Sequence, residues 1–154
     1  MPNQQIIESF LIALKNKDYE LMKELFASNI QYFDPVYSYL KQEEVIGMWK
    51  MELRSYDEYI LTWDDIIDKG DGYFSVKCNT SFLRNSNLIN LKHTLHVKIE
   101  NGFISEHSNA FSIHELVKQE KGFSGWLLGW NRYYQNIIKL KARQELYKML
   151  TIHG

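Results

Sequence analysis

The chain has 154 residues, of which 45% are hydrophobic, so it is long enough for one domain with a substantial core. Its 18 basic residues nearly balance its 19 acidic ones. The chain therefore lacks the strongly basic composition that many nucleic-acid-binding domains have, and its overall charge does not indicate a nucleic-acid partner. Cys78 is the only cysteine, which excludes an internal disulfide and a cysteine-based metal site. The N-terminus has no basic region before its apolar residues, and no apolar run reaches bilayer length, so we predict a cytoplasmic protein.

Apolar residues recur with helical spacing in three segments of the first third of the chain. The first segment spans residues 4–16 and the third spans residues 42–54. The second follows Asp18, which is expected to cap it, and runs to Phe26. We therefore predict three helices, with a strand and a loop to Leu40 between the second and the third.

Asp34 lies in that predicted strand. Ile30, Tyr32 and Val36 alternate along the segment, and Asp34 is in register with them on the inward side. A carboxylate among aromatic and aliphatic side chains costs free energy unless it is paired or protonated. We interpret Asp34 as either a turn cap that binds backbone amides near Pro35 or a working acid or base.

From Tyr56 the hydrophobic period changes to two, which predicts an antiparallel meander of four strands. Turns at residues 68–72 and 85–87 and a hairpin at 100–102 separate these strands. The two middle strands are predicted to bury Phe74, Val76, Cys78, Thr80 and Phe82, and Leu91, His93, Leu95, Val97 and Ile99. The last strand is predicted to turn Phe103, His107, Asn109, Phe111 and Ile113 inward and Ile104 outward.

His93 and His107 both fall on inward faces of strands joined by the hairpin. This pairing places His93 near Asn109 or Phe111, and we predict that both histidines and Asn109 converge on one cavity with Asp34. A histidine near a carboxylate can move a proton near neutral pH. The alternative is that each histidine is a hydrogen-bonded core residue. Their spacing matches no metal motif, so we predict no metal.

The C-terminal segment differs from the rest of the chain. Residues 131–154 carry a net charge of +4, whereas the remainder carries −5. An apolar, glycine-broken run with Trp126 and Trp130 precedes a predicted helix over 132–150. Three interpretations stay open for this run: packing against the sheet or a dimer partner, a lid over a cavity, and contact with a membrane surface.

The order of these elements resembles the cone fold of the nuclear transport factor 2-like superfamily, which includes ketosteroid isomerase and the SnoaL polyketide cyclases. Asp34-Pro35-Val36-Tyr37, Leu40 and residues 44–49 resemble the bacterial SnoaL-like group related to ketosteroid isomerase. The second half of that group is matched by Gly102-Phe103-Ile104, His107, Asn109, Phe111, Gly122, Gly125 and residues 127–130. The resemblance spans nearly the whole chain and implies a fold rather than one reaction.

The resemblance implies a proton-transferring base at Asp34, because ketosteroid isomerase uses an Asp in an Asp-Pro dipeptide for this task. That enzyme also needs an oxyanion hole, which is formed by a Tyr and by an Asp whose pKa is tuned so that it stays protonated. Those positions fall on Phe10 and near Leu95, which carry no hydroxyl or carboxyl group. Asn109 and Gln42 also depart from the Asp and Gly of the bacterial group. We therefore do not expect steroid isomerisation by the same residues.

We predict an α+β fold in which a cone-shaped, curved antiparallel sheet packs on three N-terminal helices, with a C-terminal helical extension. One domain spans 1–154, with a core over 1–118 and the extension over 119–154.

The cavity is predicted to bind a small apolar molecule, with Asp34, His107 and His93 as catalytic residues. Its ligand-binding wall is predicted to contain Phe10, Tyr32, Tyr37, Trp49, Trp63, Asn109 and Phe111. The enzymatic hypothesis is isomerase, cyclase or hydratase chemistry without a cofactor; the alternative is a non-catalytic binding or dimerisation module with a plugged cavity. We expect a homodimer and neither nucleic acid nor membrane as a partner.

Overall fold

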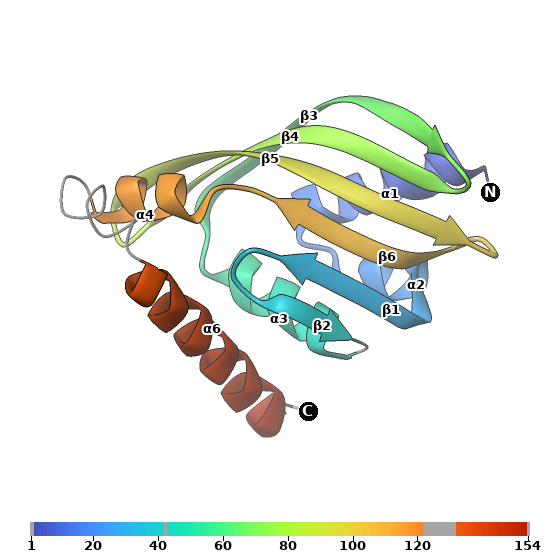
Figure 1. The fold of residues 1–154 in the computed structure, drawn as a ribbon. Helices are drawn as coiled ribbons and strands as arrows, with labels where there is room; N and C mark the ends of the chain where they lie inside the picture. Colours follow the sequence, from blue (N-terminus) through green and yellow to red (C-terminus); the bar gives the residue numbers. More distant parts are fainter. Residues whose placement is uncertain (1, 42, 122–131, 154) are drawn as a thin grey trace.

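The computed structural model describes residues 2–41, 43–121 and 132–153, and its helices and strands form an α+β cone (Figure 1). The helices are α1 (Asn3–Asn16), α2 (Tyr19–Leu25), α3 (Glu43–Arg54), α4 (Ile113–Lys121) and α6 (Arg132–His153). The strands are β1 (Phe26–Asp34), β2 (Ser38–Lys41), β3 (Asp57–Gly70), β4 (Tyr73–Arg84), β5 (Asn87–Glu100) and β6 (Phe103–Ala110). The predicted fold class, with three N-terminal helices and a C-terminal helix, is confirmed.

The first two helices begin and end where their local chemistry requires it. Lys17 adopts a left-handed conformation (φ 55°) that ends α1, and the carboxylate of Asp18 accepts a hydrogen bond from the amide of Leu21 to cap α2. The prediction that the second helix includes Phe26 is wrong. Phe26 is extended and pairs with Ile104 of β6, so sheet pairing ends the helix one residue earlier.

The sheet has six strands in the order β2-β1-β6-β5-β4-β3. The predicted meander from β3 to β6 is antiparallel throughout, whereas β1 joins it parallel to β6. β2 was predicted as part of a loop. It forms a short edge strand because Asp34 and Ser38 pair across the turn that follows β1. Helices α1, α2 and α3 lie along one face of this sheet, so the core forms between them and the inward strand residues (Figure 1).

A β-bulge corrects the predicted faces at the start of β6. Phe103, predicted inward, is 46% exposed, whereas Ile104, predicted outward, is fully buried. The register changes because Lys98 pairs with Glu106 while Ile99 pairs with Ile104, which leaves Ser105 as an extra residue. His107 and Asn109 lie beyond the bulge and keep the predicted inward direction. Ile113 was predicted on this strand, but it begins α4.

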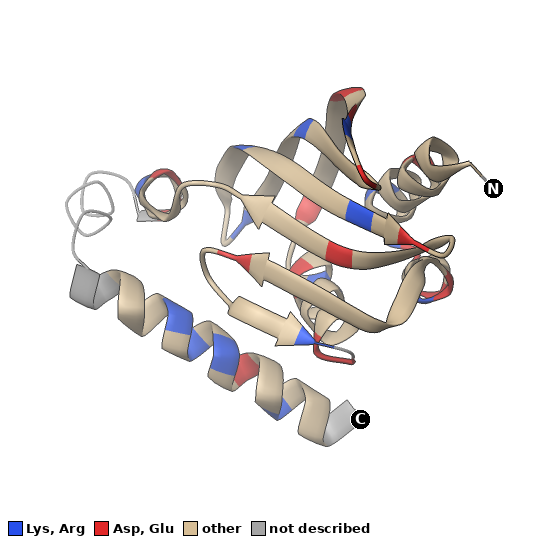
Figure 2. Cartoon of the chain, turned by 45° about the vertical axis from the view of Figure 1, so that its right-hand side comes forward, with Lys and Arg blue, Asp and Glu red and all other residues tan. Residues whose placement is uncertain are grey.

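Helix α6 packs against α3 and carries much of the basic charge of the C-terminal part (Figure 2). Leu146 of α6 is fully buried, and the guanidinium of Arg143 donates to the carbonyl oxygens of Tyr37 (2.5 Å) and Tyr39 (3.0 Å). None of the described helices is long and apolar enough to cross a bilayer. The run with Trp126 and Trp130 lies outside the described residues, so its three interpretations stay predictions.

Gly47 permits the close approach of α3 and α6. A Cβ atom at this position would lie 2.6 Å from the side chain of Leu150. We expect Gly47→Val to lower the free energy of unfolding by about 1–3 kcal/mol through overpacking. Urea denaturation measures this loss, and amide hydrogen exchange should be faster in α6 but not in α1. In a Leu150→Ala background the loss should shrink; an undiminished loss would mean that Gly47 does not act through this contact.

Candidate functional site

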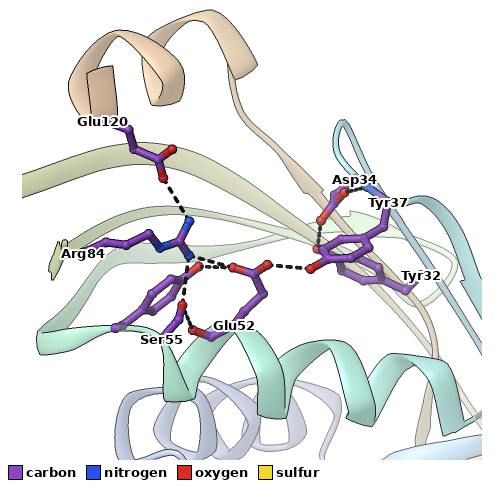
Figure 3. A network of polar contacts seen from close by, with 8 residues as sticks. Tyr32, Asp34, Tyr37, Glu52, Ser55, Arg84 and Glu120 are labelled. Carbon is purple, nitrogen blue, oxygen red and sulfur yellow. Dashed lines mark hydrogen bonds and ion pairs between the residues drawn. The ribbon is translucent and has the colours of Figure 1, made fainter. Parts of the chain in front are cut away.

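A cavity of about 820 Å³ lies where the inner face of the sheet meets α3, α4 and α6. Its apolar wall comes from several elements and includes Met48, Trp49, Phe82, Leu91, Phe111 and Val117. Helix α6 adds Ile137, Ile138, Lys141, Ala142 and Glu145 to its outer side. The polar wall is concentrated around Asp34, Glu52 and Arg84 (Figure 3).

Asp34 ends β1 and reaches this wall with its carboxylate already engaged. Its Oδ1 accepts hydrogen bonds from the amides of Val36 (2.8 Å) and Tyr37 (2.6 Å), and its Oδ2 accepts one from the hydroxyl of Tyr32 (2.7 Å). Burial raises the pKa of Asp34; these three hydrogen bonds oppose the rise, and the charge of Glu52 adds to it. Asp34 therefore caps a turn, as one of the two interpretations expected, and its carboxyl group lines the cavity with a raised pKa; a role as acid or base stays a prediction.

Glu52, near the C-terminal end of α3, is the centre of a second polar cluster. Its carboxylate accepts hydrogen bonds from the hydroxyls of Tyr37 (2.5 Å) and Tyr56 (3.1 Å) and from the guanidinium of Arg84 (3.0 Å). Burial and the neighbouring Glu52 raise the pKa of both tyrosines, so these phenols stay protonated and donate. Tyr37 thereby connects the clusters, since its amide binds Asp34 and its hydroxyl binds Glu52 (Figure 3).

Arg84, at the end of β4, joins three elements of the wall. Its guanidinium also donates to Glu120 of α4 (2.9 Å) and to the hydroxyl of Ser55 (3.0 Å), and it lies 5.1 Å from the ring centre of Tyr56. Burial alone would lower the pKa of Arg84, but Glu52, Tyr56 and Glu120 outweigh it and raise that pKa. The arginine is therefore a permanent cation held between two carboxylates.

His93 lies on β5 behind the cavity wall. One ring nitrogen, Nε2, is 2.6 Å from the hydroxyl of Thr80, and the other, Nδ1, is 2.8 Å from Oδ1 of Asn109. Burial lowers the pKa of His93 and outweighs the hydrogen bond with Asn109, which favours the charged form. As predicted, His93 is close to Asn109. Asn109 lines the cavity, but His93 does not.

His107 does not reach the cavity, in contrast to the predicted convergence with Asp34. Rings of Phe10 (4.9 Å), Tyr32 (4.9 Å) and Trp49 (5.7 Å between centres) surround its imidazole, which is 1% exposed. Neither ring nitrogen has a hydrogen-bond partner with good geometry among the described residues. Burial outweighs a contribution from the main chain of His96 and lowers the pKa of His107 to about 3. His107 is therefore a neutral core residue.

The predicted ligand-binding residues divide into two groups. Five of them line the cavity: Tyr32, Tyr37, Trp49, Asn109 and Phe111. Phe10 lies instead in the core, where its ring meets Phe26 and His107. Trp63 is half-buried on β3, with the ammonium of Lys15 5.9 Å from its ring centre. Within the described ranges, no group of three or more His, Cys, Asp or Glu side chains is arranged to hold a metal ion.

Solved structures share this architecture. No protein-family model and no curated protein sequence matches the chain. An NTF2-like protein of unknown function from Burkholderia pseudomallei is 16% identical with a TM-score of 0.69, covering 79% of this chain and 100% of its own. IdmH, a proposed polyketide cyclase from Streptomyces antibioticus, is 16% identical with a TM-score of 0.68, covering 78% and 99%. The chain has the nuclear transport factor 2-like fold.

An epoxide hydrolase of the LEH-like type from M. tuberculosis has the same fold, at 14% identity and a TM-score of 0.63, covering 81% of this chain and 89% of its own. The resemblance read from the sequence is thus confirmed for the nuclear transport factor 2-like fold. At these identities the likeness shows the fold alone, and the chemistry has to be argued from the site.

Glu52, Arg84 and Glu120 are residues of this nuclear transport factor 2-like cavity that the sequence reasoning missed. Two of them carried a signal. Glu52 follows Trp49 by three residues and so falls on the helix face predicted to be buried. Arg84 continues the inward alternation that ends at Phe82. A charged residue that continues an apolar face indicates a buried ion pair or a site.

Proposed function

We propose that the protein binds a small, largely apolar molecule in the cone cavity. The observation that supports this most directly is the cavity of about 820 Å³ with aromatic and aliphatic walls and a few converging polar groups. Binding sites for small molecules typically measure roughly 300–1,000 Å³ and have this composition. An open cavity of this size supports ligand binding over the alternative of a plugged cone.

We further propose that Asp34 moves a proton on the bound molecule, as an isomerase, cyclase or hydratase requires. A carboxylate has about four acceptor positions, and Asp34 uses three, so one lone pair is left for a ligand proton. Its raised pKa brings the group closer to the range where it can both take and return a proton. Two proteins of the same fold are described as a proposed polyketide cyclase and as an epoxide hydrolase, and the reactions that these names imply are of a related type.

Steroid isomerisation by the ketosteroid isomerase arrangement is not proposed. The positions of its two oxyanion donors fall on Phe10 and near Leu95, which are 0% and 1% exposed and are not among the residues that line the cavity. Two of the donors in this cavity, the hydroxyls of Tyr37 and Tyr56, are engaged by Glu52. The proposed reaction therefore needs a different arrangement of donors.

A non-catalytic binding module is the second candidate function. The observation that favours it is the capping role of Asp34, whose Oδ1 is fully used by the amides of Val36 and Tyr37. A carboxylate held in this way stabilises the turn before β2 without any chemistry. Ligand binding without dependence of turnover on Asp34 would support this candidate.

A thermal-shift screen of steroids, polyketide-like aromatics, terpenoid epoxides and fatty acids tests both proposals. We expect some ligands to raise the Tm of the wild type and of Asp34→Asn alike, because the amide oxygen of Asn can replace Oδ1 in the turn. Turnover of an active ligand should fall about 100-fold or more in Asp34→Asn. Asp18→Asn is the matched control and should leave both unchanged, since Asn also caps helices. Absence of any stabilising ligand would contradict binding, and equal turnover would contradict the role of Asp34.

A further inference from the structure

A hydrogen-bonded chain of side chains crosses three strands and ends at the cavity. It runs from the hydroxyl of Thr80 on β4, through the imidazole of His93 on β5, to the carboxamide of Asn109 on β6. Thr80 and His93 are 6% and 9% exposed, and neither contacts the cavity, whereas Asn109 lines it. The chain therefore connects the interior of the sheet to one polar group on the cavity wall.

The partners determine the direction of each hydrogen bond. The oxygen Oδ1 of Asn109 can only accept, so Nδ1 of His93 must carry the proton and donate. In a neutral imidazole the other nitrogen, Nε2, then accepts from the hydroxyl of Thr80. With its oxygen used by His93, Asn109 keeps its NH₂ group, which has two protons to donate.

Asn109 lies beside Asp34 on the inner face of the sheet. β1 and β6 run parallel with Phe33 paired to Ser108, and the next residues along the two strands are Asp34 and Asn109. Both line the cavity. A ligand that reaches Asp34 therefore also meets the amide of Asn109.

We propose that the Thr80–His93 pair is a positioning device that holds the NH₂ of Asn109 toward the cavity, where it donates to an acceptor oxygen on the ligand. The inference rests on the proposed function and adds a substrate class: apolar molecules with a carbonyl oxygen, such as aromatic ketones and quinones. An Asn side chain bonded to a buried histidine, which Thr80 holds in place, loses little rotamer freedom on binding, so its hydrogen bond contributes more to affinity. A free Asn on the same strand would present its oxygen and its nitrogen equally well.

The tautomer of His93 gives the first test. Long-range ¹H–¹⁵N correlation spectra distinguish a proton on Nδ1 from one on Nε2, and the loss of a signal set in His93→Gln assigns the residue. We expect the Nδ1–H form at neutral pH. An Nε2–H form would overturn the proposal, because Asn109 would then donate to His93 and present its oxygen to the cavity.

Two probes of the same shape, 9-fluorenone and fluorene, give the second test, since they differ by a carbonyl oxygen in place of two hydrogens. We expect the wild type to bind fluorenone about three- to tenfold more tightly than fluorene, the range of one neutral hydrogen bond. Asn109→Leu should bind both equally, and the infrared carbonyl band of bound fluorenone should move to higher wavenumber in this variant. Thr80→Val should reduce the preference, whereas Thr80→Ser, which keeps the hydroxyl, should retain it.

The outcomes separate this inference from the function on which it rests. Equal binding of the two probes by the wild type, or a fluorenone preference that survives in Asn109→Leu, would overturn the role of Asn109 while leaving the cavity as a binding site. Failure of both probes to bind would instead count against the proposed function for flat ligands, and the inference would fall with it.

Discussion

Replacing Arg84 with Met is expected to lower the free energy of unfolding by about 2–4 kcal/mol, because it leaves two carboxylates in the cavity wall without their shared cation. Glu52 and Glu120 lie 3.0 Å and 2.9 Å from the guanidinium, and their side chains are only 22% and 23% exposed. Glu52 would keep the hydroxyls of Tyr37 and Tyr56 as donors, whereas Glu120 would lose its ion-pair partner. Partial contact with solvent keeps the expected loss below that of a fully buried pair.

Urea denaturation of the wild type and Arg84→Met measures this loss. Lys23→Met is the matched control, because the Lys23–Glu20 pair has the same charges but side chains that are 48% and 80% exposed. We expect a change below about 0.5 kcal/mol for this control. Arg84→Lys should fall between the two, since one ammonium cannot reproduce the fork that reaches both carboxylates. Equal effects of the two Met variants would show that the Arg84 cluster does not stabilise the fold.

Acidification from pH 7 to pH 5 is expected to cost the fold about 2 kcal/mol through His107 alone. The pKa of His107 is about 3 in the folded chain against an ordinary value of 6.5, so the unfolded chain binds the proton more readily below pH 6.5. Stability from this residue is complete above pH 6.5 and is lost as the pH falls, by about 1.4 kcal/mol per pH unit until the pH approaches 3. The cause is burial inside the aromatic enclosure, which removes a charged imidazole from water and outweighs the contribution of the His96 main chain.

The difference between wild type and His107→Phe isolates this effect. The pKa of Asp34 is raised in the folded chain, so the stability from Asp34 is lost as the pH rises above the ordinary pKa of an aspartate. The pKa of His93 is lowered, so His93 adds to the loss of stability on acidification. Both are present in both proteins and cancel in the comparison. Urea denaturation at pH 7, 6 and 5 should show a shallower decline for His107→Phe, which can occupy the same aromatic enclosure. Parallel declines would mean that His107 is not buried in its neutral form.

The meander was predictable from the sequence because alternation makes each strand visible on its own. The inward residues of β4 and β5, from Phe74 to Phe82 and from Leu91 to Ile99, were assigned correctly, as was the hairpin at Asn101. The bulge at Ser105 left no local signal, since it depends on how β6 meets β5. Phe103 and Ile104 were therefore assigned to the wrong faces.

The site was only partly predictable, because each charged residue had to be judged without knowing its partners. Asp34 was recognised from its apolar neighbours, and five of the seven predicted wall residues line the cavity. Glu52, Arg84 and Glu120 come from three separate elements and make sense only together. His107 was expected in the cavity because its inward direction was visible, whereas the rings that enclose it were not.

The sequence by itself determined the three N-terminal helices, the four strands of the meander, the inward faces of β4 and β5 and the position of Asp34 on the first strand, but not β2, α4 or the end of β1 before Val36. These features depend on local periodicity and turn chemistry, which a single chain segment carries. Only the tertiary structure decided that β1 pairs parallel to β6, that Arg84 lies between two glutamates and that Asn109 lies between His93 and the cavity. These contacts join residues far apart in the chain, and no local pattern encodes which of them meet.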